Sequence, residues 1–165
     1  MIVRKVCLVG TFAVGKTSLA TRFLTNTFSG GYLPTVGVRV GSREVDLAAG
    51  DRAKLVVWDI AGHDDMSTLG STYLKGSAGI VLVADGTRAA TYLTALRLRR
   101  QAEVTLGSVP AVLVLNKRDL PDDWEVSDGV IEEAKESGLQ IFQTSAKTGD
   151  GVVDAFKAMA ELVSA

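Results

Sequence analysis

Five apolar runs, separated by stretches with helical spacing, constrain the fold of this chain most strongly. The runs are VCLVG, KLVVWDI, GIVLVAD, PAVLVLN and LQIFQTS. They are continuously apolar, which is typical of strands covered on both faces of a sheet. Residues 91–106 and 150–164 place apolar side chains at helical intervals. Strands that alternate with helices predict parallel crossover units and therefore a three-layer α/β/α domain.

Residues 38–60 depart from this rhythm. Their first half alternates between apolar and polar residues and then reaches a turn at AAGD. This pattern predicts an antiparallel hairpin that pairs residues 38–47 with residues 53–60. With the five runs, the hairpin gives a six-stranded, mostly parallel sheet with one antiparallel edge strand. Because 165 residues without a repeat or linker fit one domain, we expect a single domain over residues 1–165.

The charge balance argues against nucleic acid as a partner. The formal net charge is −1, so there is no basic surplus. The basic cluster RLRR at residues 97–100 lies in a helical pattern, and we interpret it as a solvated helix face. A nucleic-acid or lipid-binding role for this cluster is the alternative.

Several features favour a cytoplasmic protein without a lipid anchor, and we also expect a monomer. The single cysteine, Cys7, lies inside an apolar run and is expected to be a buried small side chain. No apolar stretch reaches the ~20 residues that a membrane span requires, and the first apolar run ends in a glycine-rich loop and not in a cleavage site. No glycine follows Met1 and no cysteine lies near the final residues AELVSA.

The segment GTFAVGKTSLA carries the most specific motif. Gly10, Gly15, Lys16 and Thr17 match the spacing G-x-x-x-x-G-K-[ST], between a predicted strand and a predicted helix. In such a loop, backbone N–H groups and the helix N-terminus bind phosphate oxygens. The lysine reaches the β- and γ-phosphates, and the threonine hydroxyl coordinates Mg²⁺. The expected phosphate-binding residues are Ala13, Val14, Gly15, Lys16, Thr17 and Ser18.

A second segment, LNKRD, selects the base. Asn116, Lys117 and Asp119 follow an apolar run, so they lie at the carboxyl end of a strand, where open α/β sheets bind ligands. A carboxylate at Asp119 accepts from N1–H and the 2-amino group of guanine, and adenine lacks both donors. The segment TSAK ends a further run and offers the Ala146 N–H to the guanine O6, with Ser145 and Lys147 beside it.

Five segments now occur in one order: GTFAVGKT, PTVG, WDIAGHD, NKRD and TSAK. In this the chain resembles the Ras-like small GTPases and, among them, the Rab branch. The resemblance covers essentially the whole chain and implies a P-loop NTPase fold of the G-domain type. It also implies a switch that binds GTP or GDP with Mg²⁺, hydrolyses GTP slowly, and signals through switch I and switch II to a protein effector. An exchange factor and an activating protein are implied as further partners.

The resemblance also implies roles for single residues. Phe28 would pack on the guanine plane, although simple core packing is the alternative, and Tyr32 would lie over the phosphates. The Gly62 N–H would contact the γ-phosphate. The implied Mg²⁺ ligands are Thr17, Thr35 and, through water, Asp59. The implied catalytic residues are Lys16, Thr35 and His63.

His63 departs from the family pattern, because most Ras-like proteins carry at this place a glutamine that orients the attacking water. A neutral imidazole also accepts from water, and the translational GTPases use a histidine at the corresponding place. We therefore expect His63 to be a working substitute. Impaired hydrolysis and an incidental loop histidine are the alternatives.

Phe12 is the second departure, because the family usually has glycine or a small residue beside the γ-phosphate. A phenyl ring there would exclude water or an activator's arginine, and no arginine lies close before Thr35. We therefore expect weak intrinsic hydrolysis, unless the ring folds onto an apolar neighbour. Two other functions stay open: a binding module that does not hydrolyse GTP, and an ATP-using phosphotransferase. Rab-like chains normally continue into a cysteine-bearing tail; a truncation, a domain of a larger protein and a complete prokaryotic relative are the alternatives here, and we expect the last.

Overall fold

The computed structural model describes residues 1–29, 35 and 37–165. In these residues one six-stranded sheet has the order β2-β3-β1-β4-β5-β6. All neighbouring strands are parallel except β2 and β3, which are antiparallel. The strands are β1 (Ile2–Val9), β2 (Val38–Asp46), β3 (Arg52–Ile60), β4 (Gly79–Asp85), β5 (Ala111–Asn116) and β6 (Gln140–Gln143). The predicted α/β sheet with one antiparallel edge strand is confirmed.

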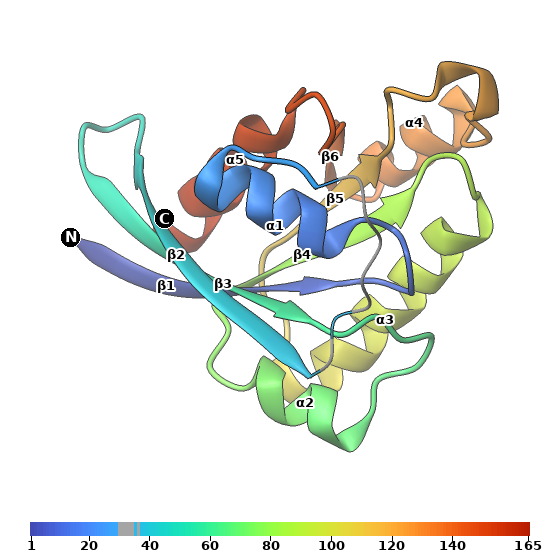
Figure 1. Ribbon diagram of the computed structural model, residues 1–165. Helices are drawn as coiled ribbons and strands as arrows, with labels where there is room; N and C mark the ends of the chain where they lie inside the picture. The colour runs from blue at the N-terminus through green and yellow to red at the C-terminus, as the bar shows by residue number, and fades with distance from the viewer. Residues whose placement is uncertain (30–34, 36) are drawn as a thin grey trace.

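Helices cover both faces of this sheet, as Figure 1 shows. One buried cluster joins β1, β3, β4 and β5 to α1 and α5, and a second joins the opposite faces of strands to α3 and α4. Successive residues of β1 alternate between the clusters: Val6 and Leu8 belong to the first, Cys7 and Val9 to the second. The helices are α1 (Lys16–Thr25), α2 (Thr68–Leu74), α3 (Ala90–Leu106), α4 (Asp128–Glu136) and α5 (Val152–Ser164), with a 3₁₀ turn at Pro121–Asp123.

The predicted hairpin is present with slightly different ends. Its register runs from Val38 opposite Ile60 to Asp46 opposite Arg52. The Leu47 N–H donates to the Asp51 carbonyl at 2.8 Å and closes the turn. Gly50 there has φ of 94°, a left-handed conformation that favours glycine. The prediction of strands over 38–47 and 53–60 is therefore correct to within one residue.

Two stacked phenyl rings join α1 to α5 in the first cluster. The centroids of Phe23 and Phe156 are 4.2 Å apart and their planes differ by 8°. Both side chains are almost completely buried. Because aromatic rings bury large apolar areas and gain from stacking, this pair is a major contact between the two helices.

The structure also bears on Cys7, on the RLRR cluster and on membrane-spanning helices. Cys7 is fully buried, as expected, with Sγ 2.9 Å from Ser77 Oγ. In the RLRR cluster, Arg97 pairs with Asp65 at 3.4 Å and Arg99 with Glu103 at 3.2 Å on the surface of α3. No helix within the described ranges has both the length and the apolar character that a bilayer crossing needs.

The topology brings the sequence motifs to one edge of the sheet. The parallel strands β1, β3, β4, β5 and β6 all end there, so the segments after them meet. Close packing starts at Gly10, where a Cβ would lie 2.5 Å from the Val83 carbonyl oxygen. A side chain at position 10 would push the loop after β1 away from β4.

Candidate functional site

The loop between β1 and α1 forms the floor of the candidate site. Ala13 and Gly15 both have positive φ, 60° and 96°, so the backbone turns sharply before α1 begins at Lys16. Gly15 is the N-cap and offers no side-chain oxygen to the first turn. The N–H groups at this helix start are therefore available for an external acceptor such as phosphate.

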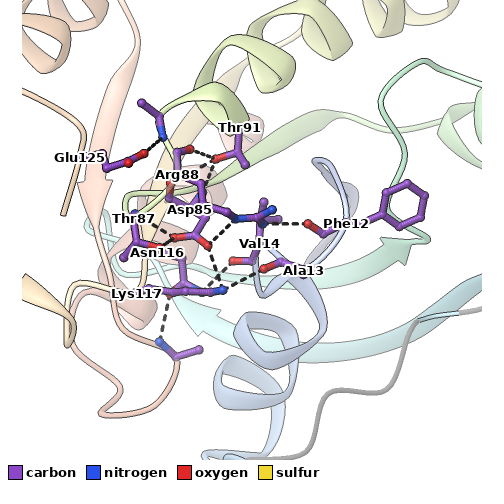
Figure 2. Close-up of polar contacts among 12 residues, drawn as sticks. Phe12, Ala13, Val14, Asp85, Thr87, Arg88, Thr91, Asn116, Lys117 and Glu125 are labelled. Atoms are coloured by element: carbon purple, nitrogen blue, oxygen red, sulfur yellow. Dashed lines mark hydrogen bonds and ion pairs between the residues drawn. The ribbon is translucent and has the colours of Figure 1, made fainter. Parts of the chain in front are cut away.

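Donors from the last residue of β5 and from the residue after it hold the outer side of this loop (Figure 2). Asn116 Nδ2 donates to the Val14 carbonyl at 3.0 Å, and Lys117 Nζ donates to the Ala13 carbonyl at 2.9 Å. In a trans peptide the C=O and the N–H point in opposite directions. Turning these carbonyls outward therefore turns the N–H groups of Val14 and Gly15 inward, in the arrangement the motif predicts.

The Asn116 side chain also joins the NKRD and TSAK segments. Its Oδ1 accepts from Thr144 Oγ1 and from the Ala146 N–H, both at 3.2 Å. The Ala146 N–H, which we expect to meet the guanine O6, therefore has an internal acceptor in this structure. Asn116 is 2% exposed, so it acts as a buried link between three loops.

Asp119 is oriented by the TSAK segment. Ser145 Oγ donates to Asp119 Oδ1 at 2.7 Å, and the Thr148 N–H donates to Ser145 Oγ at 3.1 Å. A carboxylate that is held by a hydroxyl on one oxygen is pre-positioned to accept on the other. Lys147 in the same segment is exposed, and Phe28 is 39% exposed.

The three predicted metal ligands are close together on the other side of the loop. Thr17 Oγ1 donates to Asp59 Oδ2 at 2.5 Å and is in hydrogen-bond contact with Thr35 Oγ1. Asp59 is 1% exposed, and its Oδ1 has no hydrogen-bond partner among the described residues. Burial raises the pKa of this carboxyl, although hydrogen bonds and nearby cations oppose the rise. A buried, unpartnered carboxylate oxygen beside two hydroxyls fits a hard cation such as Mg²⁺.

Lys16 lies between these two regions. It is 6% exposed, and its Nζ donates to the Thr11 carbonyl at 3.2 Å. Burial lowers its pKa to about 8, and the charge of Asp59 opposes this effect. An ammonium group held at the loop with so few partners is placed to bind an anion.

His63 adopts a defined orientation. Its Nδ1 lies 2.5 Å from the Ala61 carbonyl oxygen, which can only accept, so Nδ1 carries the proton and Nε2 of the neutral ring is an acceptor. This Nε2 is buried and unpartnered among the described residues. The ring lies near the start of α2, since a Cβ at Gly70 would be 3.8 Å from His63 Cε1.

Gly62 packs directly on the phosphate loop. A Cβ there would lie 2.9 Å from Phe12 Cα, and the His63 N–H donates to the Gly10 carbonyl at 3.3 Å. The Phe12 side chain itself is 56% exposed and has not folded onto an apolar neighbour. It borders a hollow of about 370 Å³ whose other walls include Asp64, Arg88, Thr94 and Arg97.

The structure thus brings together the phosphate loop with Asn116 and Lys117, Thr17 with Thr35 and Asp59, and Asp119 with Ser145. Tyr32 lies outside the described residues. The structure also adds Asp85, which pairs with Lys117 at 2.9 Å although its side chain is 1% exposed. Asp85 is the last residue of the apolar run GIVLVAD. A carboxylate at the carboxyl end of a buried parallel strand is a signal that identifies it from sequence.

Comparisons with known proteins agree with this geometry. The sequence profile of the Ras family matches residues 5–165. The chain is 36% identical to Ras-related protein Rab-4 of Dictyostelium discoideum over 159 residues, which cover 92% of this chain and 75% of that one. It is 34% identical to Ras-related protein Rab-13 of Canis lupus familiaris over 158 residues, 94% and 77% of the two chains. It is 35% identical to GTP-binding protein yptV2 of Volvox carteri over 164 residues, 98% and 75%.

The fold is that of a Ras-like G domain, in which a mixed sheet lies between helices and presents its loops at one edge. The chain belongs to the Ras family, and its relatives include Rab proteins.

Proposed function

We propose that this chain is a guanine-nucleotide switch that binds GTP and GDP with Mg²⁺ and hydrolyses GTP slowly. The observation that carries the proposal is the orientation of the Asp119 carboxylate by Ser145, next to Asn116, which is bonded to the phosphate loop. Membership of the Ras family supports it, as does the name of the Volvox relative, a GTP-binding protein.

In this proposal each part of the site has one task. Asp119 accepts from the guanine edge, and the inward N–H groups of the loop bind the phosphates together with Lys16. Thr17, Thr35 and Asp59 hold Mg²⁺, which when bound neutralises charge on the β- and γ-phosphates. The proposed site also includes the N–H groups of Ala13, Val14, Gly15, Ser18 and Gly62, and the residues Phe28, Tyr32, Lys117, Ala146 and Lys147.

His63 is proposed to orient the attacking water. Because Nδ1 carries the proton, Nε2 is the acceptor that such a water needs. The ring would turn away from α2 to reach the water, a movement of the kind that switch segments make when the γ-phosphate is bound.

A second candidate is a binding module that does not hydrolyse GTP. Two observations favour it: Nε2 of His63 is buried beside α2, and a bulky, exposed phenylalanine, Phe12, stands in the phosphate loop itself. In either case we propose a single cytoplasmic domain, residues 1–165, that acts as a monomer. Its proposed partners are a protein effector, an exchange factor and an activating protein.

One set of assays separates these functions. We expect fluorescent GDP bound to the purified protein to be displaced by excess GTP and not by excess ATP. Under single-turnover conditions with Mg²⁺, chromatography of the bound nucleotide should show GTP converting slowly to GDP. Stable bound GTP would select the binding module, and displacement by ATP would refute guanine recognition.

A further inference from the structure

Arg88 makes a contact with the phosphate loop that the motifs do not contain. It lies between β4 and α3, and its Nη2 donates to the Phe12 carbonyl at 2.9 Å. Its Nε pairs with Asp85 Oδ2 at 3.0 Å. One guanidinium thus bridges a buried carboxylate and a loop carbonyl, which its planar fork of donors allows. Figure 2 shows this bridge, with the Phe12 ring pointing away from it.

Asp85 fixes the position of this arginine. The Thr87 N–H and hydroxyl donate to Asp85 Oδ1 at 2.9 and 2.6 Å, and Lys117 pairs with Oδ2 at 2.9 Å. Burial alone would raise the pKa of Asp85, but hydrogen bonds from Thr87, Lys117 and Arg88 bring it below its ordinary value. The carboxylate is therefore charged and orients two cations toward the same loop.

Three successive carbonyls of the loop are consequently held from outside. Arg88 binds that of Phe12, Lys117 that of Ala13, and Asn116 that of Val14. Because each peptide is trans, holding the Phe12 carbonyl outward points the Ala13 N–H inward. A charged donor on a carbonyl also polarises the peptide and strengthens the hydrogen bond that its N–H donates.

The three donors come from different parts of the site. Lys117 and Asn116 belong to the NKRD segment, which is proposed to recognise the base. The Phe12 backbone instead packs against Gly62, where a Cβ would lie 2.9 Å from Phe12 Cα and 3.0 Å from Phe12 N. Gly62 thus packs on the Thr11–Phe12 peptide. The peptide that Arg88 holds, Phe12–Ala13, is the next one along the loop and the closest of the three held peptides in sequence to this contact, on the side where the proposed function places the terminal phosphate.

We propose that Arg88 is a positioning residue that aims the Ala13 N–H at the terminal phosphates, so that it favours GTP over GDP. This inference rests on the proposed function. It assigns discrimination between the two nucleotides to a side chain that itself does not touch them.

The test compares two nucleotides in the same variants. We would measure dissociation rates of fluorescent GDP and of a fluorescent, non-hydrolysable GTP analogue from wild type, Arg88→Ala and Arg88→Lys. For Arg88→Ala we expect the analogue to dissociate about tenfold faster, the fold-change that one charge-assisted hydrogen bond supplies, with a clearly smaller change for GDP. Arg88→Lys, which keeps the charge without the fork, should fall between wild type and Arg88→Ala.

Arg52→Ala is the matched control, because Arg52 also pairs with carboxylates, Asp46 and Glu44, but on the distant hairpin. We expect it to change neither rate. Equal acceleration of both nucleotides in Arg88→Ala, or no acceleration, would overturn the inference and leave the proposed function standing. If Arg88→Ala unfolds, the ratio of the two rates in Arg88→Lys decides. Failure of the wild type to bind either nucleotide would overturn both.

Discussion

Arg22 on α1 donates from Nε to the Ala146 carbonyl oxygen at 2.8 Å, across 124 positions of the sequence. Its Nη2 donates to the Lys147 carbonyl at 2.5 Å, and its Nη1 to the Asn26 carbonyl at 3.2 Å. One side chain therefore ties the end of α1 to the TSAK segment. The chain beyond Asn26 leads to Phe28, so Arg22 connects both segments that are proposed to hold guanine.

Replacing Arg22 should loosen the proposed guanine pocket. Arg22→Ala removes two donors from successive carbonyls of the TSAK segment, those of Ala146 and Lys147, so the backbone that follows the Ala146 N–H is held less firmly. We expect GDP to dissociate about tenfold faster. This is the effect of about one hydrogen bond and not of two, because Arg22 is partly exposed to solvent. The measurement is displacement of fluorescent GDP by excess unlabelled GDP.

Arg43→Ala provides the comparison for that measurement. Arg43 also binds a carbonyl of α1, that of Phe23 at 2.7 Å, and its guanidinium lies over the Phe23 ring. Neither of these two contacts reaches the TSAK segment. Equal acceleration in both variants would mean that general loosening of α1 explains the result.

His63 should matter for hydrolysis and not for binding. In His63→Ala the acceptor at Nε2 is lost, and we expect the single-turnover hydrolysis rate to fall at least about tenfold. GTP affinity should stay the same, because among the described residues the hydrogen bonds of His63 go to the carbonyls of Ala61 and Gly10, and neither carbonyl is a proposed donor to the base or the phosphates. His63→Gln restores an acceptor and should recover part of the rate; unchanged hydrolysis in His63→Ala would exclude the role.

Lys16 should make the stability of the nucleotide-free protein depend on pH. Burial lowers its pKa from 10.5 to about 8, so the unfolded chain binds more protons than the folded chain between these values. The free energy of unfolding therefore rises with pH across this window. Below about pH 8 the buried lysine is charged, and the folded protein carries the full desolvation cost of that charge. Near pH 7 we expect Lys16→Met to be more stable than wild type by about 3 kcal/mol.

Denaturant unfolding of both proteins, free of nucleotide, measures this difference. It should shrink as the pH is raised from about 8 toward 10.5, because the wild type gains stability there and the methionine variant does not. A difference that does not change with pH would show that Lys16 is not desolvated in the folded protein.

Phe156 and Phe12 should differ strongly in their contribution to the free energy of unfolding. Phe156→Ala removes a buried ring stacked on Phe23, and we expect a loss of about 3–5 kcal/mol in the free energy of unfolding. Phe12→Ala removes a ring that is 56% exposed and should change stability by at most about 0.5 kcal/mol. Chemical denaturation of both variants tests the contrast. A large loss of stability in Phe12→Ala would show that the Phe12 ring is packed against the protein in solution.

Local sequence patterns predicted the architecture well. The continuous apolar character of GIVLVAD and PAVLVLN follows from burial on both sheet faces, and all residues of β4 and β5 are buried. The last helix was expected over 150–164 and spans Val152–Ser164. The short helix α2 escaped prediction, because seven residues at Thr68–Leu74 give too little periodicity for a helical pattern to emerge.

The site was predictable only where a motif fixes its spacing. Lys16, Asn116 and Asp119 were found because the order of their neighbours is diagnostic. Arg22 and Arg88 were not, because an arginine on a helix or loop has no local sign that it will bind a carbonyl more than 70 positions away. Such contacts depend on which loops the sheet order brings together.

The three outward carbonyls of the phosphate loop have a thermodynamic consequence. Arg88, Lys117 and Asn116 hold them when the chain folds, so the conformational entropy of ordering this loop is lost in folding and not at the moment a ligand binds. The loop is thereby preorganised for ligand binding by donors that lie outside the binding surface. Substitutions behind the loop should tune nucleotide affinity, and they offer a wider set of adjustable positions than the residues that contact the ligand.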